Sequence, residues 1–276
     1  GKKLTLTNLG FPESKLQTFR KWINQPYGMV IISGPTGSGK STTLYASLLE
    51  ILDEGKNITT VEDPVEYQIA GINQVQMHDA IGLNFATSLR SILRQDPDIV
   101  MLGEIRDEET ARIAIQASLT GHLVLSTVHT NSAVGAITRL RDMGIESYLL
   151  ASSIKTIIAQ RLVRRLCESC KVPSDISEND ANLLWLKIGD KVFLPKGCSE
   201  CDGSGYQGRI ALAESVLVDT EMKNMIHEET SEQELQSFAF KNSDSIHEMG
   251  ADLIKSGMTS VNELIRLNNH SEDAGI

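Results

Sequence analysis

Residues 34–42, GPTGSGKST, have the composition and spacing of a phosphate-binding loop. They match the pattern G-x-x-x-x-G-K-[ST], in which glycines let backbone N–H groups face a phosphate. An apolar run precedes the loop and a helical pattern follows it, as this pattern requires. The lysine is expected to reach the β- and γ-phosphates, and the serine after it to bind Mg²⁺. The predicted nucleotide-binding residues are Gly34, Pro35, Thr36, Gly37, Ser38, Gly39, Lys40, Ser41 and Thr42.

Two further apolar runs end in residues that could act on a bound nucleotide. The run DIVMLGE (98–104) ends in Glu104, whose carboxylate could hold Mg²⁺ directly or through water. The run GHLVLSTVHT (121–130) places His129 at its far end, where a histidine can hydrogen-bond a γ-phosphate. An ordinary exposed carboxylate is the alternative for Glu104, and His122 at the near end of the run is undecided between structure and function.

Carboxylates gather after the apolar run 57–63. Pro64 stops the expected strand, so that Glu62, Asp63 and Glu66 share one turn. Carboxylates close to Mg²⁺ can orient and deprotonate an attacking water molecule, which predicts a catalytic role for Glu62 and Glu66. The alternative is a solvated turn.

The pattern of apolar runs predicts the elements that must position these residues. Strand-sized runs that are apolar on both faces occupy residues 29–34, 57–63, 98–104 and 122–130. Helical patterns lie between them at residues 41–52, 85–95 and 108–119. This alternation predicts an α/β fold with a parallel sheet covered by helices, whose ligands bind beyond the carboxyl ends of the strands. After residue 131 the pattern is helical to about residue 166.

The composition excludes some classes of protein. The chain has 276 residues, 41% of them hydrophobic, and a formal net charge of -10. An acidic chain is a poor general binder of nucleic acid, so we expect no nucleic-acid partner. Apolar runs such as MVII and HLVL fall well short of the roughly 18 residues that cross a bilayer. We therefore expect a soluble cytosolic protein without a membrane span, and the first residue, Gly1, suggests a piece of a longer chain.

The cysteines form two CxxC pairs, Cys167 with Cys170 and Cys198 with Cys201. Cytosolic disulfides are rare, whereas two such pairs suit tetrahedral Zn²⁺ held by thiolates. The residues between the pairs exceed the usual spacing of a zinc ribbon, and a redox pair is the alternative. We predict a structural zinc site.

The segments GPTGSGKST, VEDPVEY, RQDPDIVMLGEIRD and TGHLVLSTVHTN occur in this order. Together they closely resemble the Walker A, Asp, Walker B and His boxes of the secretion ATPases of bacterial type II secretion and type IV pilus assembly. The likeness spans about residues 4–217, and RLRDMGIESYLLASS looks more like the type II branch. The resemblance implies a RecA-like fold, a homohexameric ring and ATP hydrolysis coupled to assembly of a pilus-like fibre at the inner membrane.

The resemblance also implies roles for single residues. Glu66 matches the catalytic glutamate of the Asp box, Glu104 the Walker B glutamate, and His129 the histidine near the γ-phosphate. Many members carry a tetracysteine zinc element at the position of the cysteines described above. In the family, amino-terminal domains dock to a membrane platform and supply further arginines to the nucleotide. Because this sequence lacks them, we expect weak ATP turnover from the chain alone.

Arginines donated between domains or subunits also belong to the resemblance. Arg90 and Arg94 match two of these arginines, and Arg209 matches a third. Because Arg90 and Arg94 are four residues apart, they share one helix face, and guanidinium groups can stabilise charge on a transferring phosphoryl group. A solvated basic face is the alternative.

The sequence thus predicts an α/β protein with a RecA-like P-loop NTPase core, a zinc-binding segment and a helical C-terminal region. The expected boundaries are 1–166, 167–210 and 211–276. The expected function is that of an ATPase motor subunit using ATP, Mg²⁺ and Zn²⁺ in type II secretion, at the cytoplasmic face of the inner membrane with the secretion platform proteins. The alternatives are a type IV pilus assembly ATPase and an ATP-binding switch that performs no mechanical work.

Overall fold

The computed structural model describes residues 5–7, 13–35, 37–52, 55–82 and 84–269. The predicted site residue Thr36 lies outside these ranges. The elements of the first part are α1 (Glu13–Ile23), β1 (Gly28–Ser33), α2 (Lys40–Leu52), β2 (Ile58–Glu62), β3 (Asn73–Gln76), η2 (Asp79–Ile81), α3 (Phe85–Leu93), β4 (Ile99–Leu102), α4 (Glu108–Leu119), β5 (Leu123–Val128), α5 (Ala133–Asp142) and α6 (Ser147–Ser153). The elements that follow are β6 (Ile154–Leu166), β7 (Val172–Asp175), α7 (Glu178–Leu183), β8 (Lys191–Leu194), β9 (Tyr206–Leu217), α8 (Thr220–His227), α9 (Glu232–Ala239), α10 (Ile246–Lys255) and α11 (Val261–Asn269).

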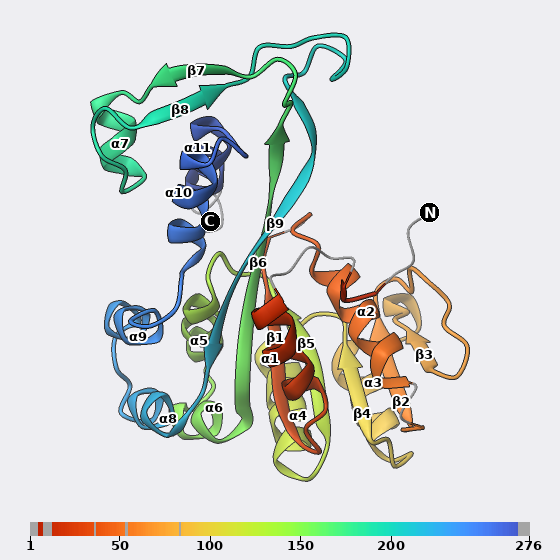
Figure 1. Cartoon of the computed structure of the whole chain (residues 1–276). Helices are drawn as coiled ribbons and strands as arrows, with labels where there is room; N and C mark the ends of the chain where they lie inside the picture. The colour runs from red at the N-terminus through yellow and green to blue at the C-terminus, as the bar shows by residue number, and fades with distance from the viewer. Residues whose placement is uncertain (1–4, 8–12, 36, 53–54, 83, 270–276) are drawn as a thin grey trace. The chain divides into compact units, whose positions relative to one another are not determined.

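In the described part of the chain, seven strands form a sheet in the order β3-β2-β4-β5-β1-β6-β9 (Figure 1). The pairs β1–β5, β1–β6, β2–β3, β2–β4 and β4–β5 are all parallel. Every residue of β1, β2, β4 and β5 is buried, as expected for strands covered on both faces. The predicted α/β fold with its parallel sheet is therefore confirmed, and the carboxyl ends of these four strands share one edge.

The strand order also fixes which helices share a face of the sheet. The chain moves in one direction along the sheet from β1 to β2, and in the opposite direction from β3 to β4, β4 to β5 and β5 to β6. Because crossovers between parallel strands are right-handed, α2 lies on one face, and α3 to α6 lie on the other. Contacts between α3 and α4, α4 and α6, and α5 and α6 agree with this arrangement.

Hydrogen-bonding caps start the helices that follow the functional strand ends. Asp107 caps α4 by accepting from the backbone N–H of Thr110 at 2.8 Å. Ser132 caps α5 by accepting from the backbone N–H of Gly135 at 2.9 Å. Such caps satisfy N–H groups that the first helical turn leaves unpaired, so each of these helices begins at a defined residue.

The prediction of helix through residues 131–166 is wrong in its last third. Helices α5 and α6 form as expected, but residues 154–166 form the long strand β6. This segment contains the β-branched residues Ile154, Thr156, Ile157 and Ile158, which favour strands. Pairing with β1 supplies the backbone partners that decide the outcome, and no local pattern reveals that pairing.

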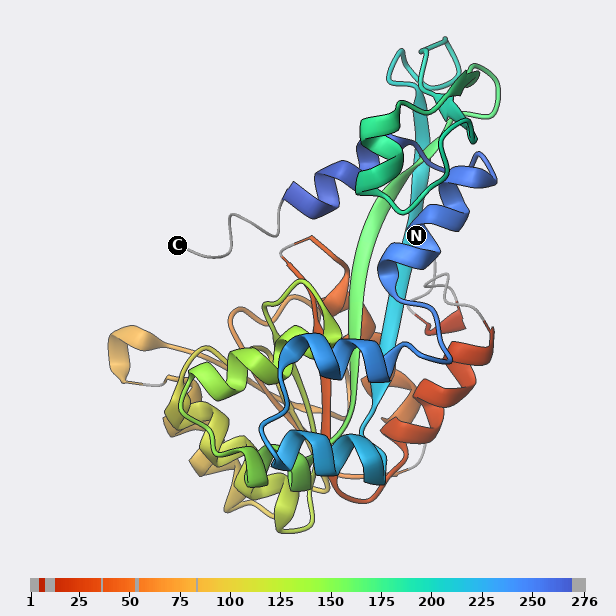
Figure 2. The same ribbon diagram turned by 90° about the vertical axis from the view of Figure 1, so that its left-hand side faces the viewer.

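The chain divides into two compact units, each built from two stretches. The first combines Gly1–Gln160 with Ser215–Asn242, and the second combines Arg161–Glu214 with Ser243–Ile276. In the first unit, α8 contacts α6 and α9 contacts α5, and Figure 2 shows these helices side by side. Arg141 of α5 secures them by donating to the carbonyls of Ile226 and Thr230. The predicted three-segment division stays a prediction.

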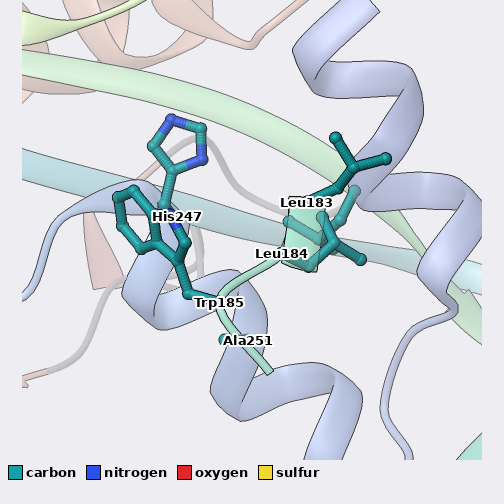
Figure 3. A pocket seen from close by; sticks show the side chains of 6 residues that line it. Leu183, Leu184, Trp185, His247 and Ala251 are labelled. Atoms are coloured by element: carbon teal, nitrogen blue, oxygen red, sulfur yellow. The ribbon is translucent and has the colours of Figure 1, made fainter. Parts of the chain in front are cut away.

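In the second unit, β7 and β8 form an antiparallel ribbon against α10 and α11. A small pocket lies between the end of α7 and the helices α10 and α11 (Figure 3) and is lined by Leu183, Leu184, Trp185, His247, Ala251 and Leu264. The Trp185 ring lies 5.3 Å from the His247 ring, centroid to centroid, and the Trp185 side chain is 66% exposed. The pocket is mainly apolar and lacks the convergent polar groups of a typical ligand site.

Candidate functional site

The phosphate-binding loop joins β1 to the first turn of α2. Lys40 is the first residue of α2, and its ammonium group donates to the carbonyl of Gly34 at 2.8 Å. The N–H of Gly34 donates to the carbonyl of Val128 at the end of β5, at 3.3 Å. Gly37 and Gly39 have φ angles of 82° and 87°, a conformation that favours glycine. The loop therefore presents the N-terminus of α2, which attracts anions.

Ser38 gives the loop a second feature suited to phosphate. Its side chain is buried, and its hydroxyl has no hydrogen-bond partner among the described residues. A buried hydroxyl without a partner costs free energy that an oxygen-rich ligand can offset. Packing at Gly34 is tight, since an added Cβ would lie 2.3 Å from Ser38 Oγ and 2.8 Å from the carbonyl oxygen of Gln160. The loop thus fits an anion held at close range by its backbone.

Lys40, Glu104 and His129 meet at the carboxyl edge of the sheet. Burial lowers the pKa of Lys40, and the charge of Glu104 opposes this shift. Burial and the charge of Lys40 lower the pKa of His129, again against Glu104, and Arg139 adds a smaller lowering effect. Each of the three side chains therefore lies close enough to the other two to feel their charge. The sequence predicted them from three separate motifs.

Arg106 is a site residue that the motif reasoning did not identify. Its Nε donates to Glu104 Oε2 at 2.7 Å, and its guanidinium lies 3.7 Å from Asp63 Oδ2. The same guanidinium stacks over the Phe85 ring at 5.3 Å. Arg106 thus joins the ends of β2 and β4. Its position two residues after Glu104 was the available signal.

The two carboxylates of the Asp box differ in their surroundings. Glu62 is 3% exposed and accepts hydrogen bonds from the hydroxyl of Tyr45, the hydroxyl of Thr60 at 2.7 Å and the amide of Gln74 at 3.2 Å. Glu66 lies in the loop after β2 with its side chain exposed. A carboxylate whose oxygens are occupied by protein donors is poorly placed to take a proton from water, so Glu66 is the better candidate base.

The predicted arginines have different environments. Arg90 pairs with Glu109 of α4 at 2.7 Å, and Arg94 is an exposed residue at the C-cap of α3. Arg209 is exposed on β9 and belongs to the second compact unit. The ring Nδ1 of His122 lies 3.0 Å from the carbonyl oxygen of Ala117, near the end of α4. This contact favours a structural role for His122.

The other described residues of the loop are Pro35, Ser41 and Thr42. Ser41 and Thr42 are exposed in the first turn of α2, directly after Lys40. Pro35 is partly buried, and its carbonyl accepts from the N–H of Ser38 at 3.2 Å. Ser41 therefore lies where a hydroxyl could bind Mg²⁺ beside the lysine.

The second candidate site is a cluster of cysteines in the second unit. The sulfur atoms of Cys167, Cys170, Cys198 and Cys201 all lie within 4.8 Å of one another. The separations of Cys167 from Cys198 and of Cys170 from Cys201 are both 3.8 Å, and that of Cys198 from Cys201 is 3.7 Å. All four cysteines are free. A tetrahedron of sulfurs with Zn–S bonds of about 2.3 Å has edges of about 3.8 Å, so these separations fit Zn²⁺.

Backbone groups around the cysteines favour thiolates. N–H groups of Cys198 and Gly205 donate to Cys201 Sγ, both at 3.2 Å, and the N–H of Gly197 donates to Cys170 Sγ at 3.4 Å. Burial opposes the charged form of Cys201, yet the N–H groups of Cys198 and Gly205 and the neighbouring thiols bring the pKa of its thiol to about 6. Against the backbone hydrogen bond from Cys201, burial and the side-chain hydrogen bonds with Cys201 and Cys167 raise the pKa of the Cys198 thiol to about 11, so the charge lies mainly on Cys201. Gly197 and Gly205 have φ angles of 103° and 84°, which let the chain turn tightly enough to bring both N–H groups to sulfur.

The chain is similar to secretion and pilus proteins over nearly its whole length. The family described as Type II/IV secretion system protein matches residues 1–266. The chain is 48% identical over 271 residues to the "Type II secretion system ATPase E" of Vibrio cholerae, covering 98% of this chain and 54% of that protein. It is 48% identical over 269 residues to the "Type IV pilus assembly ATPase PilB" of Myxococcus xanthus, covering 95% and 48%. The chain thus spans about half the length of these curated relatives.

Solved structures support the assignment of the fold. The crystal structure of "the Pilus Retraction Motor PilT and Bound ADP" is similar with a TM-score of 0.71 and 26% identity, covering 95% of this chain and 66% of that chain. The predicted fold and the predicted family resemblance are both confirmed by these similarities. In the described part of the chain, no helix is both long and apolar enough to cross a membrane.

Proposed function

The chain belongs to the Type II/IV secretion system protein family, and from this premise we propose that it is the ATPase part of a secretion motor. Its reaction is the hydrolysis of ATP to ADP and phosphate, coupled to assembly of a pilus-like fibre in bacterial type II secretion. The observation that carries the proposal is the convergence of Lys40, Glu104 and His129 beside the phosphate-binding loop. Lys40 begins α2, Glu104 follows β4 and His129 follows β5, and the three groups meet where α/β proteins bind ligands.

In this proposal the residues of the site have separate tasks. The loop backbone and Lys40 bind the phosphates, and Glu66 accepts the proton of the attacking water molecule. His129, whose pKa is lowered by burial and by Lys40, is neutral near pH 7 and donates a hydrogen bond to the γ-phosphate. Arg90 on α3 and Arg94 at the C-cap of α3 are both exposed, and they stabilise the transferring phosphoryl group of a neighbouring subunit, as Arg209 does from β9.

Two metal ions belong to the proposal. Ser41 and Glu104 would hold Mg²⁺, and the exposed Ser41 hydroxyl and the Glu104 carboxylate are oxygen donors of the kind this ion prefers. Bound Mg²⁺ neutralises charge that develops on the phosphate oxygens. The four cysteines would hold Zn²⁺, since their sulfur separations match a tetrahedral site. With four protein ligands this ion has no open position, so its role is structural.

The proposed assembly is a homohexamer at the cytoplasmic face of the inner membrane. It works with inner-membrane secretion platform proteins. The net charge of -10 supports the absence of a nucleic-acid partner. A DNA-binding assay at low salt tests this last point, because binding there would favour a DNA-translocating motor.

Turnover of ATP by the chain, with and without a fused hexamer-forming partner, tests the motor proposal. Lys40→Ala is the blank, because it removes the ammonium group that binds phosphate. We expect much faster turnover in enforced hexamers, since arginines from neighbours complete each site. Equal turnover in both forms would remove the main support for a ring mechanism, and turnover unaffected by Lys40→Ala would refute the site itself.

A type IV pilus assembly ATPase is the second candidate function. It is favoured by the 48% identity to the Myxococcus xanthus protein, which equals the identity to the Vibrio cholerae protein. Chimeras that join this chain to the amino-terminal half of each relative distinguish the two. If only the chimera with the Vibrio cholerae half restores its function, which is secretion, the type II assignment is supported. If only the chimera with the Myxococcus xanthus half restores its function, which is piliation, the pilus assignment is supported.

A further inference from the structure

The loop that carries Glu66 is held by side chains at several backbone positions. The N–H of Val65 donates to Gln76 Oε1 at 3.3 Å. The amide of Gln74 accepts from the N–H of Ile69 at 2.8 Å and donates to the carbonyl of Tyr67 at 2.7 Å. The Glu66 side chain is exposed. The structure thus fixes the backbone on both sides of Glu66 while leaving its carboxylate accessible.

Tyr45 holds the backbone of Glu66 itself. This residue lies in the second turn of α2, the helix that begins with Lys40, and it is 2% exposed. Its hydroxyl accepts a hydrogen bond from the N–H of Glu66 at 3.1 Å and donates one to the carboxylate of Glu62. Its ring packs perpendicular to the Tyr67 ring, with 5.4 Å between the ring centroids. Tyr45 therefore connects the phosphate-binding helix directly to the loop of the candidate base.

Glu62 fixes the direction of this connection. It accepts from Tyr45, Thr60 and Gln74, so the Tyr45 hydroxyl must point its proton at Glu62 and its lone pairs at the N–H of Glu66. Burial and the hydrogen bond to Glu62 raise the pKa of Tyr45 to about 12, so the hydroxyl keeps its proton at neutral pH. A phenylalanine would fill the same space but could neither donate to Glu62 nor accept from Glu66.

We propose that Tyr45 is a positioning residue for ATP hydrolysis, which sets the backbone of Glu66 relative to the helix that begins at Lys40. Glu62 and Gln74 serve the same purpose by orienting Tyr45 and the flanking loop. This inference rests on the proposed function, because it takes Glu66 to be the base. Its physical reason is that small displacements of a catalytic group lower the rate of the chemical step far more than they lower substrate affinity.

The test compares the single-turnover rate of ATP hydrolysis with the dissociation constant of ATP, for the full chain in excess over nucleotide. For Tyr45→Phe we expect the rate to fall about tenfold to a hundredfold, since a misplacement of about 1 Å has that effect. The dissociation constant should change less than about twofold, because Lys40 and the loop glycines are untouched. Tyr148→Phe, which removes the same hydroxyl from an exposed side chain of α6, should match the wild type in both.

A second variant guards against misfolding. If the melting temperature shows that Tyr45→Phe does not fold, Gln74→Ala decides, because Gln74 lies on β3 and is only partly buried. It should show the same loss of rate without loss of affinity. A wild-type rate in the folded variant, or equal losses of rate and affinity, would overturn the inference.

Glu66→Gln separates this inference from the proposed function. If Glu66→Gln abolishes hydrolysis while Tyr45→Phe leaves it unchanged, the positioning role is refuted and the base assignment stands. If Glu66→Gln hydrolyses ATP at the wild-type rate, the base assignment is refuted whatever Tyr45→Phe does.

Discussion

Replacement of Gly37 by alanine tests whether the positive φ angle of the phosphate-binding loop is needed for nucleotide binding. Gly37 has a φ of 82°, and no described atom lies within 4 Å of the position that a Cβ would take. Gly82 is a matched control, because its φ is 79° and its Cβ position is equally open. The two substitutions therefore add the same backbone strain without a steric collision, one in the loop and one near η2.

The expected size of the effect follows from this geometry. A left-handed conformation costs a non-glycine residue about 1–2 kcal/mol. If Gly37→Ala relaxes to another conformation in the free chain, nucleotide binding must restore the strained one. An energy of about 1–2 kcal/mol corresponds to a dissociation constant that is roughly 5-fold to 30-fold higher. Gly82→Ala should leave the dissociation constant unchanged while lowering the free energy of unfolding by a similar amount.

Isothermal titration with Mg-ATP measures the dissociation constants, and urea unfolding measures the stabilities. If Gly37→Ala relaxes in the free chain, its stability stays at the wild-type level, and unchanged affinity in that case would mean that the nucleotide-bound loop does not use this backbone conformation. Gly34→Ala tests separately whether a steric clash in the loop weakens nucleotide binding, because its Cβ would lie 2.8 Å from the backbone oxygen of Gln160. That variant should lose more affinity than Gly37→Ala.

Three further outcomes follow from other parts of the structure. Cys167→Ser should remove one equivalent of zinc in metal analysis and destabilise the second unit, because such sites supply roughly 10–16 kcal/mol of folding free energy in zinc-finger peptides. In a Trp22→Phe background, the fluorescence of Trp185 reports the unfolding of this unit. Unchanged zinc content would refute the site. Glu263→Ala should lower the free energy of unfolding of the same unit in urea by about 1–3 kcal/mol. The Glu263 carboxylate is 1% exposed and accepts from the backbone N–H of Arg164 at 2.8 Å, so its removal leaves that N–H without this acceptor. The side chains of Arg164 and Arg266, which pair with Glu263, are half exposed and regain water. Burial and Lys40 lower the pKa of His129 in the folded protein, so the unfolded chain binds a proton at this imidazole more readily, and stability falls as the pH drops through about 6.5. His129→Gln should therefore weaken the decline in melting temperature between pH 7 and 5. A decline identical to that of the wild type would contradict this linkage.

Local signals were sufficient for four of the seven strands of the described sheet and for the main motifs. The strands at residues 28–33, 58–62, 99–102 and 123–128 are short, apolar and followed by glycine or polar residues, and each was predicted within two residues at its start. Burial on both faces favours apolar residues, which dominate β1, β4 and β5, whereas β2 also buries Thr59, Thr60 and Glu62. The metal site of the four cysteines could also be predicted from the sequence, because the CxxC spacing of the thiolate ligands is the same whatever lies between the two pairs.

The helix predicted through residue 166 shows where local reasoning failed. The segment that forms β6 has neither strict alternation nor a long apolar run, and its state depends on pairing with β1, which lies more than a hundred residues earlier. Such pairing is a property of the assembled sheet and leaves no local signal. The same limit applies to Arg106, whose partners Glu104 and Asp63 come from two strand ends.

The sequence by itself determined which chemical groups are available: a phosphate-binding loop, carboxylates and a histidine at strand ends, and paired cysteines. Residue type and short spacing carry that information, because each motif is a local requirement of its ligand. Only the tertiary structure decided how the two glutamates of one turn differ. Glu62 is buried under three donors from α2, β2 and β3, whereas Glu66 is exposed on a loop held by Tyr45. The donors Tyr45, Thr60 and Gln74 all lie outside the segment VEDPVEY, so that segment alone could not separate the two glutamates.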